Sequence, residues 1–181
     1  MWAIRQSEYI FRSPWLTIRK DAVQTEKGVE INDFYVLEYP TWVNVIAITK
    51  EGKFVIEQQH RHGIRQRVYE ICAGVCESDE EPLAAAQREL QEETGFGGGR
   101  WSHIGKYAPN PSAMNNWCHS FLAEGVERIS SPNQEPTEDI SILQVSAKEV
   151  LSMMLKGEIV EGTMLTSLWQ YFHKQTKFSK L

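Results

Sequence analysis

Apolar and polar side chains alternate in short runs over the first forty residues, a pattern typical of half-buried β-strands. Residues 15–18 and 34–37 are two such runs, and Glu-Lys-Gly at residues 26–28 is typical of a turn between strands. We therefore predict that residues 1–40 form a small β-sheet of their own.

The next segment has the pattern of a buried sheet. Residues 43–49 are rich in β-branched side chains, residues 50–53 are typical of a turn, and residues 54–58 return as a second apolar strand. A further strand is predicted at residues 67–71. Together these runs predict the centre of a larger sheet.

The pattern changes from strand to helix after Gly74. Ser78 or Asp79 can cap this helix, and Pro82 falls in its first turn, where a missing N–H costs little. Gly95 is suited to end it. One apolar stripe is formed by residues with the spacing of a single helix face: Leu83, Ala86 and Leu90.

Strands return in the second half of the chain. They are predicted at residues 101–107, 117–123 and 140–145. Residues 125–138 are polar and contain two prolines, which predicts a long mobile loop. Such loops within a compact domain are commonly functional.

Two helices are predicted at the end of the chain. Ser146 and Glu149 have the spacing of a capping box, for a helix that ends at Gly157. A last helix over residues 163–174 is expected to bury four apolar side chains: Leu165, Leu168, Trp169 and Phe172. Because strands precede, separate and follow the helices, the fold class is α/β or α+β.

The composition is that of an ordinary globular protein. The chain has 181 residues, 41% hydrophobic and 24% charged, enough for one domain or one domain with a small appendage. A net charge of −5 and a pI of about 5.6 argue against a protein that binds a nucleic-acid backbone. No apolar run approaches a membrane span, and the three cysteines fit no disulfide framework. We expect a cytoplasmic protein with no nucleic-acid or membrane partner.

Acidic residues concentrate on the central helix. Seven of the 24 lie between Glu77 and Glu93, where only Arg88 carries the opposite charge. One interpretation is a solvated acidic face, whose early carboxylates favour the helix dipole. Glu89, Glu92 and Glu93 share one face near the C-terminal end, where the dipole disfavours anions. The other interpretation is therefore a set of oxygen ligands for a hard cation such as Mg²⁺. The residue types alone do not decide between these two interpretations.

The spacing of these residues carries a family resemblance. From Gly74 to Phe96 the chain resembles, position for position, the Nudix box G-x5-E-x7-R-E-U-x-E-E-x-G-U, where U is a bulky apolar residue. Seven fixed and two apolar positions within 23 residues make this signal far more specific than a lone glycine motif.

The resemblance extends beyond the box. Gln59-His60-Arg61, then Glu70-Ile71-Cys72-Ala73-Gly74 and Glu77, are similar to the Q-Y-R … E-x-P-A-G-x-x-E pattern of ADP-ribose and related nucleotide-sugar pyrophosphatases. In this chain a His replaces the usual Tyr and a Cys the usual Pro. Pro111 lies 15 residues beyond Phe96, near where that subfamily carries a proline.

The resemblance implies a fold and an assembly. Residues 41–181 are expected to form a Nudix α/β/α sandwich with a mixed sheet, in which the box is a loop–helix–loop. In such pyrophosphatases an N-terminal antiparallel sheet swaps across a homodimer, and residues 1–40 are the corresponding segment. Several aromatic side chains of this segment are either faces for a nucleotide base or ordinary core and dimer contacts: Trp2, Tyr9, Phe11 and Trp15.

The resemblance also implies a metal site. Carried over residue by residue, it makes Glu89 and Glu93 the primary ligands of Mg²⁺, with Mn²⁺ as the alternative ion. Glu92 is a further ligand or a catalytic anchor, and the carbonyl of Ala73 completes one site. Arg88 and Glu70 are expected to orient the carboxylates, with a purely structural role equally open for Glu70. The supporting residues of the motif are Gly74, Glu80, Arg88, Gly95 and Glu70.

The catalytic base is expected on the loop after the box. Glu138 is the first choice and Glu135 the second, with a merely solvated loop as the alternative. Arg61 has the geometry to hold a phosphate through two hydrogen bonds. The expected substrate-binding residues are Arg61, Arg65, Arg67 and Pro111.

A zinc site is not expected from the histidines and cysteines. His60 and His62, with Cys72 and Cys76, match no spacing of a structural zinc site. Core or surface roles are the expected alternative for these side chains.

The implied function is Mg²⁺-dependent hydrolysis of the diphosphate in ADP-ribose or a similar nucleoside diphosphate sugar. The alternatives are the same chemistry on GDP-mannose, NADH or a dinucleoside polyphosphate, or a sensor that binds without turnover. The intact glutamates argue against a sensor, which has no need of a full metal cluster. Isoprenoid diphosphates are disfavoured by the residues around Gly74.

Overall fold

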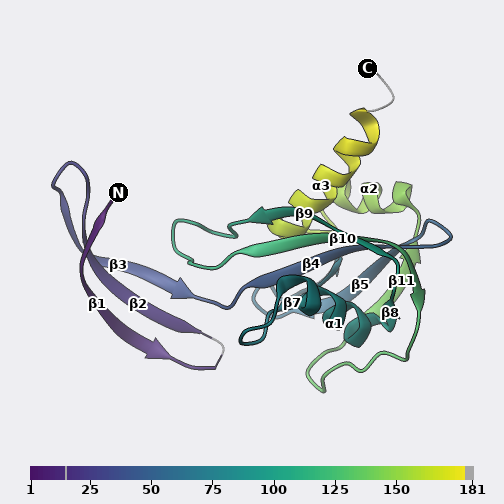
Figure 1. Cartoon of the computed structure of the whole chain (residues 1–181), viewed down its shortest axis with the longest axis horizontal. Helices are drawn as coiled ribbons and strands as arrows, with labels where there is room; N and C mark the ends of the chain where they lie inside the picture. The colour runs from purple at the N-terminus through teal and green to yellow at the C-terminus, as the bar shows by residue number, and fades with distance from the viewer. Residues whose placement is uncertain (15, 178–181) are drawn as a thin grey trace. The chain divides into compact units, whose positions relative to one another are not determined.

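The computed structural model describes residues 1–14 and 16–177 and contains two compact units (Figure 1). The first comprises Met1–Thr41 with Ala108–Trp117, and the second comprises Trp42–Tyr107 with Cys118–Leu181. Within the described part of the chain, no helix has the length and apolar character needed to cross a membrane.

The first unit is built on a small antiparallel sheet in the order β1-β2-β3, as predicted. Its strands are β1 (Ala3–Arg12), β2 (Thr17–Gln24) and β3 (Glu30–Glu38). The predicted turn joins β2 to β3: Gly28 donates its N–H to the carbonyl of Thr25 and has a φ of 82°, which glycine adopts without strain. Every residue of β1 is exposed, so this sheet encloses little core by itself.

Aromatic side chains of the first unit make contacts within the sheet. Trp2 packs edge-on against Phe34, with ring centroids 6.0 Å apart. The guanidinium of Arg12 lies 3.8 Å from the ring centroid of Tyr9. Phe11 is exposed, and Trp15 lies outside the described residues.

The second unit contains an eight-stranded mixed sheet with the path β11-β5-β4-β10-β8. β6 pairs with β5, β7 with β4 and β9 with β10; β4 and β10 are parallel, and the other pairs are antiparallel. The strands are β4 (Trp42–Thr49), β5 (Phe54–Arg61), β6 (Gln66–Glu70), β7 (Cys72–Val75), β8 (Phe96–Gly97), β9 (Arg100–Tyr107), β10 (Cys118–Arg128) and β11 (Ser141–Val145).

Helices cover both faces of this sheet (Figure 1). They are α1 (Pro82–Thr94) on one face, and α2 (Ala147–Lys156) and α3 (Gly162–Lys177) on the other. Successive side chains of β4 point to opposite faces. Val43 and Val45 therefore pack toward α1, and Ile46 and Ile48 pack toward α2 and α3. The predicted α/β/α sandwich with a mixed sheet is confirmed.

The start of α1 differs from the prediction. The helix begins at Pro82 after Glu81, which makes no side-chain cap, so neither Ser78 nor Asp79 caps it. Leu83 is 41% exposed, so it is not part of the buried face of the helix as predicted. Ala85 is buried in its place, beside the predicted Ala86 and Leu90. Gly95 ends the helix as predicted, with a φ of 74°.

The loop after β10 is shorter than predicted. β10 runs on to Arg128, because Gly125, with a φ of 78°, accommodates a bulge between Glu124 and Val126 without ending the pairing with β4. The irregular segment therefore begins at Ile129 rather than at Gly125.

The two last helices largely follow the prediction. Ser146 and Glu149 form the complete capping box of α2, and Gly157 ends that helix in the left-handed conformation. In α3, Leu168 is fully buried, but Trp169 is exposed. The prediction for Trp169 was wrong, since it lies about 100° around the helix from Leu168 and so faces away from the sheet.

Candidate functional site

The deepest part of the site is the carboxylate of Glu93, in the last turn of α1. Its residue is 4% exposed, and it accepts a hydrogen bond of 3.3 Å from the backbone N–H of Ala73. Burial raises the pKa of Glu93 to about 8, and the negative charges of Glu89 and Glu138 add to the shift. A carboxyl group in this position favours a proton or a nearby cation.

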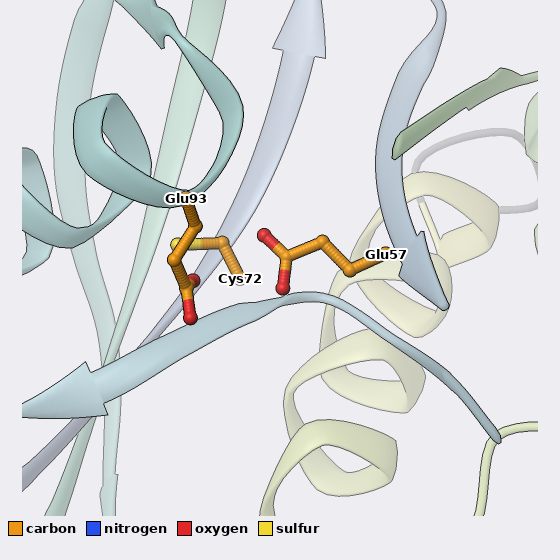
Figure 2. A group of neighbouring side chains, drawn as sticks. All are labelled: Glu57, Cys72 and Glu93. Carbon is orange, nitrogen blue, oxygen red and sulfur yellow. The ribbon is translucent and has the colours of Figure 1, made fainter. Parts of the chain in front are cut away.

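Two further buried side chains point toward Glu93 (Figure 2). Glu57 comes from β5 and Cys72 from β7, and one ligand atom of each of the three residues lies within 4.8 Å of the other two. Burial raises the pKa of Glu57 and of Cys72 well above their usual values, and the charge of Glu93 adds to both shifts. Within the described residues, neither carboxylate oxygen of Glu57 has a hydrogen-bond partner.

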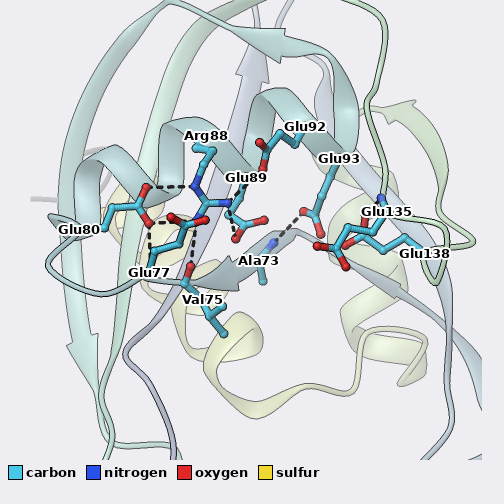
Figure 3. Close-up of polar contacts among 10 residues, drawn as sticks. All are labelled: Ala73, Val75, Glu77, Glu80, Arg88, Glu89, Glu92, Glu93, Glu135 and Glu138. Atoms are coloured by element: carbon cyan, nitrogen blue, oxygen red, sulfur yellow. Dashed lines mark hydrogen bonds and ion pairs between the residues drawn. The ribbon is translucent and has the colours of Figure 1, made fainter. Parts of the chain in front are cut away.

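Glu89 lies one turn earlier on α1 and contacts the backbone at Gly74 (Figure 3). A Cβ at Gly74 would lie 2.0 Å from Cδ of Glu89 and 2.2 Å from its Oε1. Any side chain at this position would displace the carboxylate, so the close approach requires glycine. The partial burial of Glu89 raises its pKa.

Arg88 holds the outer carboxylates of the site. Its Nε and Nη2 donate to Glu80 at 3.0 Å, and its Nη1 lies 3.0 Å from oxygens of both Glu89 and Glu92. Nη2 also donates to the carbonyl of Val75 at 3.0 Å. One guanidinium therefore fixes three carboxylates and the strand before the helix. Its hydrogen bonds lower the pKa of Glu80.

The donor atoms around Gly74 suit a hard divalent cation. Glu89, Glu92 and Glu93 supply carboxylate oxygens, and the Glu89 carboxylate occupies the space that a Cβ of Gly74 would fill, next to the backbone of Ala73. These three carboxylates do not form the tightest group, because Arg88 draws Glu89 and Glu92 toward itself. Within the described chain, the group of three with ligand atoms inside 4.8 Å is the buried one at Glu93.

The loop that carries the two predicted bases is fixed to the end of α1. Gln134 donates through Nε2 to the carbonyl of Glu93 at 2.9 Å, and Asn133 donates its N–H to the carbonyl of Glu92 at 2.7 Å. Glu138 accepts a hydrogen bond of 2.8 Å from the N–H of Glu135, and both side chains lie beside Glu93 (Figure 3). Glu138 is half-buried, whereas Glu135 is exposed.

Gly95 fixes the other end of this loop. Its carbonyl accepts hydrogen bonds from the N–H groups of Ile129 and Ser130, and a Cβ at Gly95 would lie 2.4 Å from the carbonyl oxygen of Ser130. The glycine of the motif is therefore required both for the helix end and for the approach of the loop.

The predicted substrate arginines are arranged differently from one another. Arg61 makes two hydrogen bonds to the buried Glu70, of 2.8 Å from Nε and 2.5 Å from Nη2. The pairing with Glu70 therefore occupies Nε and Nη2, the kind of paired N–H donors that were expected to hold a phosphate. Arg67 pairs with Asp139 at 2.6 Å, and Arg65 is exposed with a φ of 55°. Pro111 is exposed and belongs to the first compact unit.

A cavity of about 550 Å³ adjoins the backbone at Ala73 and Gly74. Arg61 and Glu70 line it on the side of the carboxylates, and Asn44 and Thr163 are among the residues that line the remainder. The cavity is large enough for a small ligand. Its lining includes Ala73 and Gly74, which contact the carboxylates of Glu93 and Glu89 respectively.

Two residues of the site were not found from the sequence. Glu57 leaves one signal, a lone acidic side chain directly after the apolar run Phe54-Val55-Ile56. Gln134 leaves none, because its contact with the end of α1 depends on the path of the loop. Among the predicted residues, the structure gathers those of the box, Ala73 and the two loop glutamates, but not Pro111.

The sequence matches two known families over nearly its whole length. Residues 38–165 match the NUDIX domain, and residues 2–37 match the nucleoside diphosphate sugar hydrolase N-terminal domain. The chain belongs to the NUDIX family. The resemblance of the box to Nudix proteins is thus confirmed.

Relatives and a solved structure agree with this assignment. The chain is 27% identical over 156 residues to the ADP-ribose pyrophosphatase of Bacillus subtilis (strain 168). The aligned residues cover 86% of this chain and 84% of that protein. It is 26% identical over 171 residues to the methanol dehydrogenase activator of Bacillus methanolicus, covering 94% and 91%. The crystal structure of an ADP compounds hydrolase superposes with a TM-score of 0.85 at 18% identity, covering 99% and 97%, and confirms the fold of this Nudix protein.

Proposed function

We propose that this Nudix protein hydrolyses the diphosphate linkage of ADP-ribose or a similar nucleoside diphosphate sugar, releasing a nucleoside monophosphate and a sugar phosphate. One observation supports this most strongly. The carboxylate of Glu89 rests on Gly74 beside Glu93, and Gly74 also lines a cavity of about 550 Å³.

Nudix hydrolases generally need divalent metal ions. We propose Mg²⁺ as the ion, with Mn²⁺ as the alternative, held by Glu89, Glu93 and the carbonyl of Ala73, with Glu92 as a further ligand or anchor. Such an ion supplies charge neutralisation at the diphosphate and a more acidic water. Arg88 positions Glu89 and Glu92 for this role.

The protein's own groups then move the proton. We assign the general base to Glu138, because it is half-buried, lies beside Glu93 and is fixed by the N–H of Glu135. It takes the proton of the attacking water, and the phosphate of the leaving half departs with the bonding electrons. Glu135 is the second choice, since it is more exposed.

The cationic side chains at the cavity are proposed to meet the substrate phosphates. Arg61 lines the cavity, and because Glu70 engages Nε and Nη2, it approaches a phosphate with the rest of its guanidinium. Arg65 and Arg67 are proposed as assisting groups. Pro111 is retained as a substrate contact on the resemblance alone.

We further propose a homodimer formed through the N-terminal sheet, in the cytoplasm. β1 exposes apolar side chains along its length, including Ile4, Ile10 and Phe11, which a second chain would cover. The cysteines are free, as in a reducing compartment. Light scattering should give about twice the chain mass of 20.8 kDa.

The test of the function is hydrolysis across a panel with and without Mg²⁺, with products identified by mass. The panel contains ADP-ribose, ADP-glucose, GDP-mannose, NADH and diadenosine polyphosphates. Selective release of AMP from ADP-ribose is the expected result. Metal-dependent activity on another member of the panel would support the same reaction with a different substrate. Tight binding of a member without turnover would overturn the proposed hydrolysis and favour a sensor.

A further inference from the structure

Three buried ligand groups converge from three different elements beneath the site. Glu57 from β5 is 0% exposed, Cys72 from β7 is 1% exposed and Glu93 from α1 is 4% exposed. One ligand atom of each lies within 4.8 Å of the other two, and the side chains point toward one another (Figure 2). The sheet and the helix therefore build a small polar centre inside an apolar layer.

Glu57 is the unexplained member of this group. Buried polar groups normally have hydrogen-bond partners, and an unpartnered buried carboxylate is costly. Yet neither oxygen of Glu57 has a partner in the described part of the chain. Arg61, whose charge acts on Glu57, is engaged by Glu70, and the amide of Gln59 also donates to Glu70. A proton or a further cation would compensate the charge where Glu57, Cys72 and Glu93 meet.

We propose that Glu57, Cys72 and Glu93 bind a divalent cation of borderline softness, of the Zn²⁺ class, at a second, buried site that shares only Glu93 with the outer cluster of Glu89, Glu92 and Glu93 around Gly74. Two carboxylate oxygens and one sulfur suit Zn²⁺ or Co²⁺, whereas Mg²⁺ prefers oxygen alone. Binding releases to solvent the thiol proton and any proton held by the two carboxyl groups, as the metal–sulfur and metal–oxygen bonds form. The inference concerns binding and stands independently of the proposed hydrolysis.

The spacing of the three groups is compatible with one ion. Ligand atoms around a four-coordinate Zn²⁺ lie about 3.5 Å apart, so atoms within 4.8 Å need to approach by about 1 Å. Rotation of the Glu57 side chain supplies this movement, since no hydrogen bond from the described residues holds its carboxylate. Glu93 has two carboxylate oxygens, and one of them accepts from Ala73 on the side of the outer cluster. It can therefore serve both sites.

Cobalt is the probe that separates this site from the outer one, because a thiolate bound to Co²⁺ gives a charge-transfer absorption in the near ultraviolet. The intact protein titrated with Co²⁺ should show this band, and Zn²⁺ should abolish it. Cys72→Ser should lack the band, whereas Cys76→Ser and Cys118→Ser, as matched controls, should keep it. Absence of the band from the unaltered protein, or its loss with Cys76 or Cys118 alone, would overturn the proposal.

Two further variants test the carboxylates. Glu57→Gln should weaken Co²⁺ binding roughly ten-fold or more, and Glu57→Leu repeats the test without a buried polar group should the glutamine variant not fold. Glu89→Gln should retain the band, since Glu89 belongs to the outer cluster. Unchanged affinity in both folded Glu57 variants, or loss of the band in Glu89→Gln, would refute a separate site.

Discussion

The carboxylate of Glu89 lies so close to Gly74 that a Cβ on the glycine would come within 2.0 Å of its Cδ. The helix of the Nudix box and the strand before it are therefore in contact through a side chain on one and a bare backbone on the other. Gly74 also lines the cavity, and its contact with Glu89 makes the first glycine of the box a determinant of the site's geometry.

Gly74→Ala should reduce kcat/KM by roughly 100-fold, since the added methyl displaces the Glu89 carboxylate by about 1 Å or more. Gly162→Ala is the matched control, because nothing lies within 4 Å of a Cβ built there. Steady-state kinetics and a circular dichroism spectrum of both variants check this. Normal turnover in folded Gly74→Ala would contradict the importance of the contact.

Arg88→Met should weaken the activating metal roughly ten-fold or more, because Glu80, Glu89 and Glu92 lose the cation that positions them. The measurement is the Mg²⁺ concentration for half-maximal activity. Arg100→Met serves as control, since the pair of Arg100 with Glu124 is exposed and contributes little. Equal metal requirements in the two variants would argue against a positioning role for Arg88.

Arg61→Met should lower the free energy of unfolding by roughly 2 kcal/mol or more, because Glu70, 1% exposed, would keep its charge without its cation. Denaturant titration measures this change. Arg67→Met removes an exposed pair with Asp139 and should change stability by less than about 1 kcal/mol. The reverse order of the two losses would contradict the structural role of the buried pair.

Glu138→Gln should lower kcat with little change in KM, because a base contributes to the chemical step more than to binding. The expected loss is about 100-fold or more. The same change at Glu135 should have a small effect, since Glu135 is exposed. If kinetics show the larger loss for Glu135→Gln, the base is misassigned.

Without metal, the protein should lose stability as pH rises from about 5 to 8. The pKa of Glu93 is near 4.5 when unfolded and about 8 when buried, so the folded state holds a proton that the unfolded state has given up. The contribution of this proton to the stability of the folded state is complete below the unfolded pKa of 4.5. It is lost as pH rises through the folded pKa of about 8. Thermal unfolding in a chelator at several pH values measures the slope.

Glu93→Gln provides the control for this pH dependence. The amide does not titrate, so the variant should show a smaller slope, together with a kcat reduced by orders of magnitude if Glu93 is a metal ligand. If the thermal unfolding temperature of the metal-free parent protein stays constant or rises over the same pH range, the raised pKa of Glu93 is contradicted.

The sequence by itself determined the features that depend on local spacing. Box residues from Gly74 to Phe96 are close in sequence, so helix geometry alone places Glu89, Glu92 and Glu93 on one face. The same holds for Ser146 with Glu149 and for the turn at Gly28, where neighbouring backbone groups satisfy one another. The β-branched, almost continuously apolar run at residues 43–49 was sufficient to predict a buried strand, because a strand covered on both faces is apolar at nearly every position.

Only the tertiary structure decided which distant residues meet. The pairing of β5 with β6 places Glu57 opposite Glu70, and it brings the side chains of Gln59 and Arg61 to the carboxylate of Glu70. The packing of α1 on β7 then brings Glu93 to Cys72. No local pattern encodes these contacts, since each depends on which faces the sheet and helices bury. For the same reason, three features became visible only in the folded chain: the exposure of Leu83, the pairing of Arg61 with Glu70, and a Glu57 carboxylate without a hydrogen-bond partner among the described residues.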